Sequence, residues 1–282
     1  MAMKPKNRGG CRFNSAMTLA LMVGLLGAAL PVAAAAPGQA IWVDLLTEDA
    51  ATAIDFYRQL VGWKIEPYSS GNYVVSNDGH PIAGISEIKD ADPEGEEALW
   101  LVGMAVPDLA DSVAAARELG AKVHRDVGRV EGFASFAVLE DPQGAAFMLL
   151  APERPFDEPK TVGSWVWTEL WTHDTDAAAG FYGDVIGYER TEIDRAGDPY
   201  LLFETGGEHR SGLVQIDNKQ VDPIWAPYLG VADVAATAAK AKELGGRVLL
   251  APDPKLGEGR VALLADPTGG AFFIYGLEET TP

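Results

Sequence analysis

The chain is poor in cysteine, histidine and positive charge. Its one cysteine among 282 residues is Cys11, so the sequence after it offers neither a disulfide nor a thiol nucleophile. It has 22 Lys and Arg against 41 Asp and Glu, a formal net charge of −19. Nucleic-acid binding requires a basic patch, so this balance argues against a nucleic-acid partner. No glycine-rich phosphate loop, GxSxG elbow or paired-histidine motif is present. The acidity suits a soluble protein and would favour a cationic ligand.

The first 36 residues differ from the rest and are expected to be a signal peptide. A basic head without acidic residues precedes an uncharged stretch of fifteen residues, Ala16–Leu30, and then a run of small residues, Ala33–Ala36. The apolar stretch is shorter than the roughly 20 residues of a membrane span. We therefore expect cleavage near Ala36, no membrane attachment afterwards, and a periplasmic or secreted mature protein. Losing the four basic residues of the head lowers the net charge from −19 to −23. An uncleaved signal anchor is the alternative.

The sequence of residues 41–150 is repeated at 166–275. The same offset of 125 relates Trp42 to Trp167 and Trp100 to Trp225, and it also relates the Asp-Pro pairs at 141 and 266. One register held over so many anchors indicates a duplicated domain. The stretch between the copies is rich in proline and charge and is expected to be a linker. The predicted division is domain 1 at 37–151, linker at 152–163, domain 2 at 164–277 and a tail at 278–282.

Each copy contains two strand-helix-strand-strand-strand units. Helices are expected at 50–60, 108–119, 175–186 and 234–244, and Asp49 and Asp174 can cap the first turns of the first and third helices. Gly62 is expected to end the first helix. Short strands separated by Gly, Asn and Asp turn signals fill the remainder. Asp141 to Gly144 has the residue pattern of a type I turn between the last two strands of its copy.

The order of these motifs resembles the vicinal oxygen chelate superfamily, which includes glyoxalase I, bleomycin-resistance proteins and extradiol dioxygenases. Asp49, Phe56-Tyr57 and Gly62-Trp63 look like its opening motif, and Asp174, Phe181-Tyr182 and Gly187-Tyr188 repeat it. The resemblance implies an α+β fold of two tandem glyoxalase-like domains. Each domain would comprise two βαβββ units that form a cup-shaped mixed sheet with helices outside. Two such domains in one chain would make an internal pseudo-dimer, so we expect a monomer or a homodimer.

The same resemblance places metal ligands at positions where this chain has none. Superfamily enzymes hold a divalent metal with His, Gln or Glu side chains that project into the cup. At the matching positions the chain has aromatic, aliphatic, proline or thioether side chains, which do not ligate a hard or borderline cation. We therefore expect no metal and no other cofactor. These positions are Trp42, Val102, Met148, Trp167, Pro227 and Phe273.

We expect the cups to be lined by aromatic side chains with one acid each. Strand residues alternate between faces, so Asp44 shares a face with Trp42, and Glu169 shares one with Trp165, Trp167 and Trp171. The predicted ligand-binding residues are Trp42, Trp100, Met148, Trp167, Trp171, Trp225 and Phe273, with Trp100 and Trp225 at the rim.

Aromatic walls with a carboxylate suit a flat or cationic organic molecule. The leading hypothesis is therefore an exported, metal-independent protein that binds a small aromatic or cationic compound. A buried Asp44 or Glu169 would have a raised pKa and would be a candidate general acid or base, so an enzyme (a lyase, isomerase or dioxygenase) remains open. The third hypothesis is a non-binding structural module in which Trp42 and Trp167 fill both cups.

Overall fold

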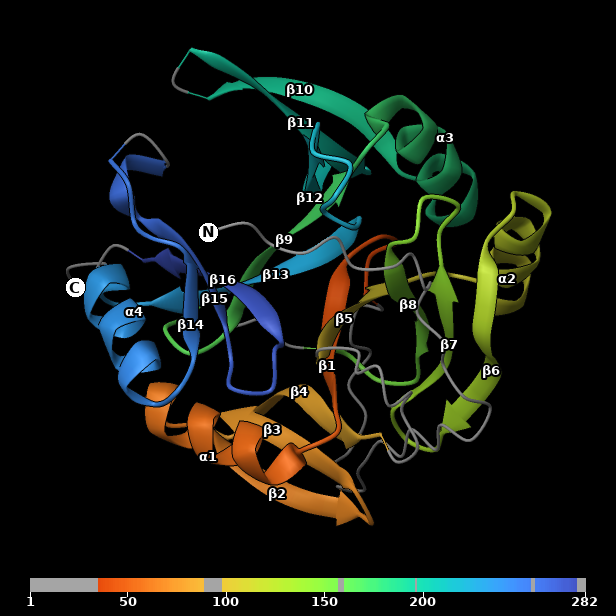
Figure 1. The fold of residues 1–282 in the computed structure, drawn as a ribbon. Helices are drawn as coiled ribbons and strands as arrows, with labels where there is room; N and C mark the ends of the chain where they lie inside the picture. Colours follow the sequence, from red (N-terminus) through yellow and green to blue (C-terminus); the bar gives the residue numbers. More distant parts are fainter. Residues whose placement is uncertain (1–34, 89–97, 157–159, 196, 255–256, 278–282) are drawn as a thin grey trace.

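A computed structural model describes residues 35–88, 98–156, 160–195, 197–254 and 257–277, which form two mixed sheets of eight strands each (Figure 1). The strand orders are β2-β3-β4-β1-β5-β8-β7-β6 and β10-β11-β12-β9-β13-β16-β15-β14, so the second sheet repeats the topology of the first. In each sheet the first strand of the domain pairs in parallel with the fourth and antiparallel with the fifth. The predicted α+β fold of two tandem cup-shaped domains is confirmed. Most of the signal peptide expected at 1–36, part of the linker and the tail at 278–282 lie outside the described residues.

The first sheet and its helices lie between residues 40 and 152. In chain order the elements are β1 (Ala40–Thr47), α1 (Ala50–Val61), β2 (Lys64–Ser69), β3 (Asn72–Asn77), β4 (His80–Glu87), β5 (Leu99–Ala105), α2 (Leu109–Glu118), β6 (Lys122–Val130), β7 (Ala134–Glu140) and β8 (Ala146–Pro152).

The second sheet and its helices lie between residues 165 and 276. In chain order the elements are β9 (Trp165–Thr172), α3 (Thr175–Ile186), β10 (Glu189–Arg195), β11 (Asp198–Thr205), β12 (Glu208–Gln215), β13 (Ile224–Val231), α4 (Val234–Glu243), β14 (Arg247–Leu250), the short 3₁₀ turn η1 (Gly257–Gly259), β15 (Val261–Ala265) and β16 (Ala271–Gly276).

The four helices begin as their sequences predict. Asp49, Asp108, Asp174 and Asp233 each accept a hydrogen bond from a backbone N–H of the first helical turn. Gly62 ends α1 in the left-handed conformation, at φ 77°, which glycine adopts without a steric penalty. The helices therefore start and stop at local sequence signals, and this orients the strands on either side of them.

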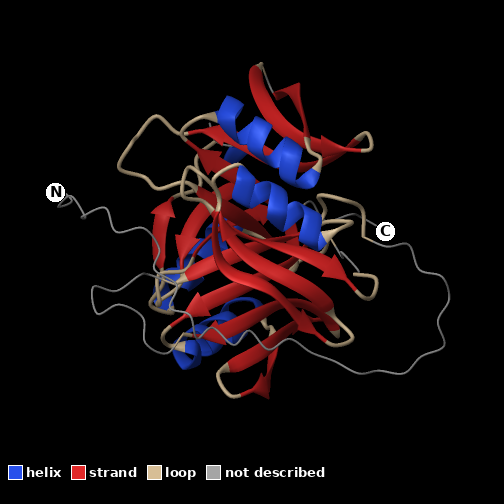
Figure 2. Cartoon of the chain, turned by 90° about the vertical axis from the view of Figure 1, so that its right-hand side faces the viewer, coloured by secondary structure: helices blue, strands red, loops and turns tan. Residues whose placement is uncertain are grey.

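The hydrophobic cores under the helices are shared between the domains. Helix α1 packs against α4 and α2 packs against α3, and both pairs are visible at the margin of the molecule in Figure 1. Figure 2, turned by 90°, shows one helix pair in front of the strands. One core combines α1 and the β1 side of domain 1 with α4 and β16 of domain 2, and the other combines α2 with α3. The helices of each domain therefore share a hydrophobic core with helices of the other domain.

Reciprocal hydrogen bonds join the two domains. Tyr57 of domain 1 donates from its hydroxyl to Asp266 Oδ2 of domain 2 at 2.8 Å, and Tyr182 of domain 2 donates to Asp141 Oδ2 at 2.9 Å. The two pairs are equivalent under the repeat. Burial is the main cause that raises the pKa of both tyrosines, and the neighbouring aspartate adds to it, so both phenols remain hydrogen-bond donors.

The aspartate of each pair also organises the turn predicted at its own position. Asp141 Oδ1 accepts from the backbone N–H groups of Gln143, Gly144 and Ala145, and the Gly144 N–H also reaches the Asp141 carbonyl at 3.0 Å. One side chain therefore closes the hairpin of its own domain with one oxygen and holds the other domain with the second. Within the described part of the chain, no helix has the length and apolar character needed to cross a bilayer.

Candidate functional site in the two cups

The concave inner face of each sheet is the candidate site. The first cup contains Trp42, Asp44 and Met148, and the second cup contains Trp167, Glu169 and Phe273. Residues directly opposite each other on antiparallel strands point to the same face of a sheet. Asp44 lies opposite Leu101 of β5, and Glu169 lies opposite Ala226 of β13, which places both acids on the inner face. The predicted pairing of a tryptophan and an acid on the first strand of each cup agrees with this geometry.

Trp100 and Trp225 do not lie at the rim of the cups, contrary to the sequence-based expectation. Trp100 is opposite Leu45 and Trp225 is opposite Leu170, and both leucines point toward the helices. Each indole N–H donates to a tyrosine hydroxyl, Trp100 to Tyr57 at 3.0 Å and Trp225 to Tyr182 at 2.8 Å. These tryptophans extend the hydrogen bonds between the domains and do not face a cup.

Trp165 also leaves the inner face, because strand β9 contains an irregularity. Trp167 pairs with Tyr228, but Trp165 pairs with the next residue, Leu229, so Val166 is an extra residue in the ladder. The bulge turns Trp165 toward the helices, where its ring packs 4.9 Å from that of Trp100. Strand β1 has the same irregularity between Ala40 and Trp42. The simple alternation assumed from the sequence fails at this one step in both domains.

The first cup is filled by the protein's own side chains. Trp42 is 3% exposed and Met148 is 1% exposed. Phe133, from the turn between β6 and β7, meets the Trp42 ring edge-on with centroids 4.9 Å apart. Phe156, from the segment after β8, lies 6.5 Å from Trp42, and the Arg154 guanidinium lies 5.1 Å from the Phe156 ring. In domain 1, the tryptophan at the position where the superfamily has a metal ligand is therefore part of the packed core.

Asp44 is a buried acid with very little hydrogen bonding. Its side chain is 0% exposed, Oδ2 receives a 3.4 Å bond from Ser86 Oγ, and Oδ1 has no partner among the residues that the structure describes. Burial raises the pKa of Asp44 to about 8, partly offset by Ser86. Gly84 faces this acid, and a Cβ at that position would collide with Asp44 Oδ1.

The second cup is open where the first is closed. Trp167 and Trp171 are half-buried, whereas their counterparts Trp42 and Leu46 are buried in the first cup. The same contrast holds on β16, where Tyr275 is half-buried but its counterpart Leu150 is buried. Phe273 itself is 2% exposed and forms the floor of the cup. The second cup therefore presents the rings of Trp167 and Trp171 to solvent, whereas the equivalent residues of the first cup are buried.

Glu169 is held by three donors, unlike Asp44. Tyr200 donates to Oε1 at 2.5 Å, while Tyr228 at 2.5 Å and the Trp171 indole N–H at 2.9 Å donate to Oε2. Trp167 donates in turn to the Tyr200 hydroxyl at 3.1 Å. Burial, then the charge of Glu169, raises the pKa of both tyrosines, which keeps the phenols protonated. One carboxylate therefore positions four aromatic side chains.

These aromatic side chains form a continuous wall. Phe273 stacks on Tyr228 with ring centroids 4.4 Å apart and an interplanar angle of 8°, and its other neighbour, Trp171, lies 5.4 Å away. Arg195 lies over the Tyr200 ring at 5.1 Å. The sequence-based reasoning missed Tyr200 and Tyr228. Tyr228 is one residue from the expected position at Pro227 and could have been found by pairing the first and fifth strands of the repeat.

The side chains in the cups do not fit a divalent metal. Trp42, Met148, Trp167 and Phe273 do face the cups at the positions where the superfamily has ligands, and none offers a suitable donor atom. Val102 instead belongs to the helix-facing core. Each cup has one carboxylate, and the described residues contain no group of three or more His, Cys, Asp or Glu that could hold an ion. A metal-free protein stays a prediction.

The geometry agrees with comparisons to known proteins. Solved structures similar in fold include the Mn(II)-bound glyoxalase from Novosphingobium aromaticivorans (TM-score 0.58, 14% identity, covering 85% of this chain and 82% of that one). Another is a variant of homoprotocatechuate 2,3-dioxygenase from Brevibacterium fuscum (TM-score 0.59, 17% identity, 87% and 73% covered).

Similar sequences extend over most of the chain. The protein named "Putative glyoxylase CFP32" of Mycobacterium tuberculosis (strain CDC 1551 / Oshkosh) is 31% identical over 241 residues, covering 83% of this chain and 92% of the relative. The "Anthracycline biosynthesis protein DnrV" of Streptomyces peucetius is 30% identical over 268 residues, covering 88% and 96%. Residues 40–150 and 166–275 each match the model of the glyoxalase-like domain. The chain therefore belongs to the glyoxalase-like family, with two copies of its domain in tandem.

Proposed function

We propose that the protein is a metal-independent binder of a small, flat aromatic compound that carries a cationic group, and that the second cup is its binding site. The observation that carries this proposal is the set of half-buried aromatic side chains around Glu169, which has no counterpart in the filled first cup. An aromatic ligand gains contact area against Trp171 and Trp167. A cation over an indole or phenol ring adds about 0.5–2 kcal/mol, and the buried carboxylate behind the rings adds attraction of the same sign.

The names of two kinds of relative favour different uses of such a site. Relatives from Streptomyces carry the name of anthracycline biosynthesis proteins, and anthracyclines are polycyclic aromatic compounds. That name supports an aromatic ligand for this chain. A relative named as a glyoxylase supports the enzyme alternative. In that alternative, Glu169 would be the general acid or base, and Tyr200 and Tyr228 would hold it in position by donating hydrogen bonds.

The remaining parts of the proposal concern where and in what form the protein acts. The basic head and apolar stretch before Ala36 support export to the periplasm or the medium. The reciprocal Tyr–Asp pairs already join two domains within one chain, which supports a monomer, and a homodimer is the alternative. The small-molecule ligand is the only partner proposed.

The test is a binding titration on residues 37–282 with 9-aminoacridine, a planar aromatic cation, followed by quenching of tryptophan fluorescence. We expect saturable binding that weakens about tenfold in Trp171→Leu and severalfold in Glu169→Gln, because the first removes wall area and the second removes the negative charge. The neutral compound acridine at high pH should bind more weakly. The metal content of the same preparation should be substoichiometric.

The repeat supplies the matched control. Asp44→Asn is the equivalent change in the filled first cup and should leave the titration unchanged. Equal losses in Asp44→Asn and Glu169→Gln would reject the second cup as the site. A stoichiometric transition metal in the purified protein would reject metal independence. Turnover of α-keto-aldehyde thiol adducts without added metal would favour the enzyme.

A further inference from the structure

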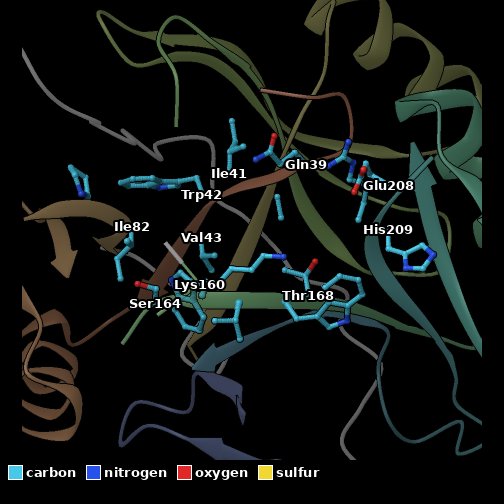
Figure 3. A pocket seen from close by; sticks show the side chains of 16 residues that line it. Gln39, Ile41, Trp42, Val43, Ile82, Lys160, Ser164, Thr168, Glu208 and His209 are labelled. Atoms are coloured by element: carbon cyan, nitrogen blue, oxygen red, sulfur yellow. The ribbon is translucent and has the colours of Figure 1, made fainter. Parts of the chain in front are cut away.

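We propose that a second site, in a pocket between the two domains, binds a small aromatic carboxylate. The pocket has a volume of about 160 Å³ and is lined by residues 39–43 at the start of β1 and by residues 164–168 at the start of β9. These two segments are equivalent under the 125-residue repeat, so the pocket lies where the same part of each domain meets its copy. Figure 3 shows side chains of both segments around it. Trp167 lies between this pocket and the second cup, because it lines the pocket and also donates to Tyr200. The other residues of the proposed site, among them Glu169, Trp171 and Tyr228, do not line the pocket.

The charge of the pocket is opposite to that of the protein. Two cations, Lys160 and Arg210, line it against the one carboxylate of Glu208, whereas the whole chain has a net charge of −19. His209 also lines the pocket, and its imidazole lies 3.7 Å from Glu204. His209 and Arg210 lie three and two residues before Gly212, the glycine of β12 that pairs with Glu169. The equivalent positions of β4, before Gly84, are Pro81 and Ile82, which carry no charge. The basic groups therefore come from β12 and from the segment between the domains. A cluster of cations in an acidic protein favours an anionic ligand by local attraction.

Lys160 is available to such a ligand. It is exposed, and it forms no ion pair with any residue in the described part of the chain. Figure 3 shows its side chain extended across the pocket, with the ammonium end toward Thr168. Arg210 donates from Nε to Thr205 Oγ1 at 2.8 Å and from one terminal nitrogen to the Thr205 carbonyl. That anchoring fixes its guanidinium and leaves the second terminal nitrogen for a ligand carboxylate.

The walls and the volume indicate the rest of the ligand. Apolar side chains from both domains, including Ile41, Ile82 and Val166, line the pocket beside the basic groups. A dry cavity of about 150 Å³ is large enough for one benzene ring. A single aromatic ring with a carboxylate therefore matches the space, the apolar walls and the positive charge. Because both domains contribute wall residues, the bound ligand would also stabilise their arrangement.

The test uses benzoate as the probe on residues 37–282, by calorimetric titration at low and moderate salt. We expect saturable binding of benzoate, binding at least tenfold weaker for the neutral isostere benzamide, and loss of benzoate affinity as salt rises. Lys160→Gln should raise the benzoate Kd about fivefold. Lys242→Gln removes the same charge from exposed α4, outside the pocket, and should change the Kd less than twofold.

A second pair of variants separates this site from the second cup. Arg210→Gln should weaken benzoate binding, while Tyr228→Phe in the second cup should leave it unchanged. Failure of 9-aminoacridine to bind would therefore reject the proposed function, while the proposed benzoate site between the domains would still stand. Equal binding of benzoate and benzamide, equal effects of Lys160→Gln and Lys242→Gln, or no benzoate saturation at 10 mM would each overturn the inference.

Discussion

The two cups share one frame and differ in what fills it. Both place a tryptophan two residues before an acid on the first strand, and in both a glycine faces the acid from the neighbouring parallel strand. In the first cup Phe133 and Phe156 cover the tryptophan, and the acid has one long hydrogen bond, from Ser86. In the second cup the tryptophan is half-buried and the acid has three donors.

The comparison shows that a carboxylate in the same place can have opposite physical roles. Asp44 is short, and apart from Ser86 its neighbours on the inner face are Leu101 and Leu46, which offer no hydrogen bond. Glu169 is one methylene longer and reaches Tyr228, whose counterpart in domain 1 is Gly103. A tyrosine on the fifth strand therefore turns a poorly solvated acid into the centre of a polar network.

The largest expected difference between the cups is in the cost of removing the first-strand tryptophan. Trp42→Ala should lower the free energy of unfolding by about 4 kcal/mol, because it leaves a large cavity under Phe133. Trp167→Ala should cost less than about 2 kcal/mol, because that side chain is half-buried. Urea unfolding of both variants measures the difference. Equal costs would mean that the second cup is as tightly filled as the first.

The next difference is in pH dependence. The pKa of Asp44 is about 8 in the folded protein and near 3.8 when unfolded, so the folded state holds an extra proton between these values. Stability is therefore greatest near the acid end of this window and falls as pH rises from about 4 to 8, by roughly 3 kcal/mol after allowance for relaxation.

Asp44→Asn should remove this slope and gain stability relative to the unmodified protein above pH 7. Thermal unfolding at several pH values from 5 to 9 measures it. A variant that keeps the full slope would show that Asp44 is ionised in the fold through a solvated conformation.

The reciprocal pairs between the domains should behave alike, because here the domains do not differ. Tyr57→Phe and Tyr182→Phe should each cost about 2 kcal/mol, since each leaves a buried carboxylate oxygen and an indole N–H without their partner. Denaturant unfolding of the two variants checks this. A cost in only one of them would mean that the two halves of the interface are not equivalent in solution.

The smallest effect is expected for the residue that covers the first cup. Phe156→Ala should cost about 1 kcal/mol, because Phe156 is only half-buried, yet it should expose the Trp42 ring. Acrylamide quenching of tryptophan fluorescence should therefore increase. No increase would show that Phe133 alone closes the cup.

Much of the fold follows from local patterns in the sequence. The caps at Asp49 and Asp174, the turn at Asp141 and the 125-residue repeat predict the helices, hairpins and domain duplication that the structure contains. The placement of Trp42, Asp44, Trp167 and Glu169 on the inner faces was also predictable, because alternation within one strand is a local property.

Three tryptophans show where that reasoning ends. Alternation gives the relative face of residues along one strand, but the absolute face of Trp100 and Trp225 depends on their register with the first strand of the domain. Trp165 changes face because of a bulge, which depends on the pairing partner and not on the strand's own sequence.

The sequence by itself determined the two domains, their elements and the acid and tryptophan placed at each cup. Only the tertiary structure decided that the first cup is closed and the second is open, because Phe133, Phe156, Tyr200 and Tyr228 reach the cups from other strands and turns. Distant contacts of this kind set the burial of a group, and burial sets whether a carboxylate is left without partners or is held by three donors.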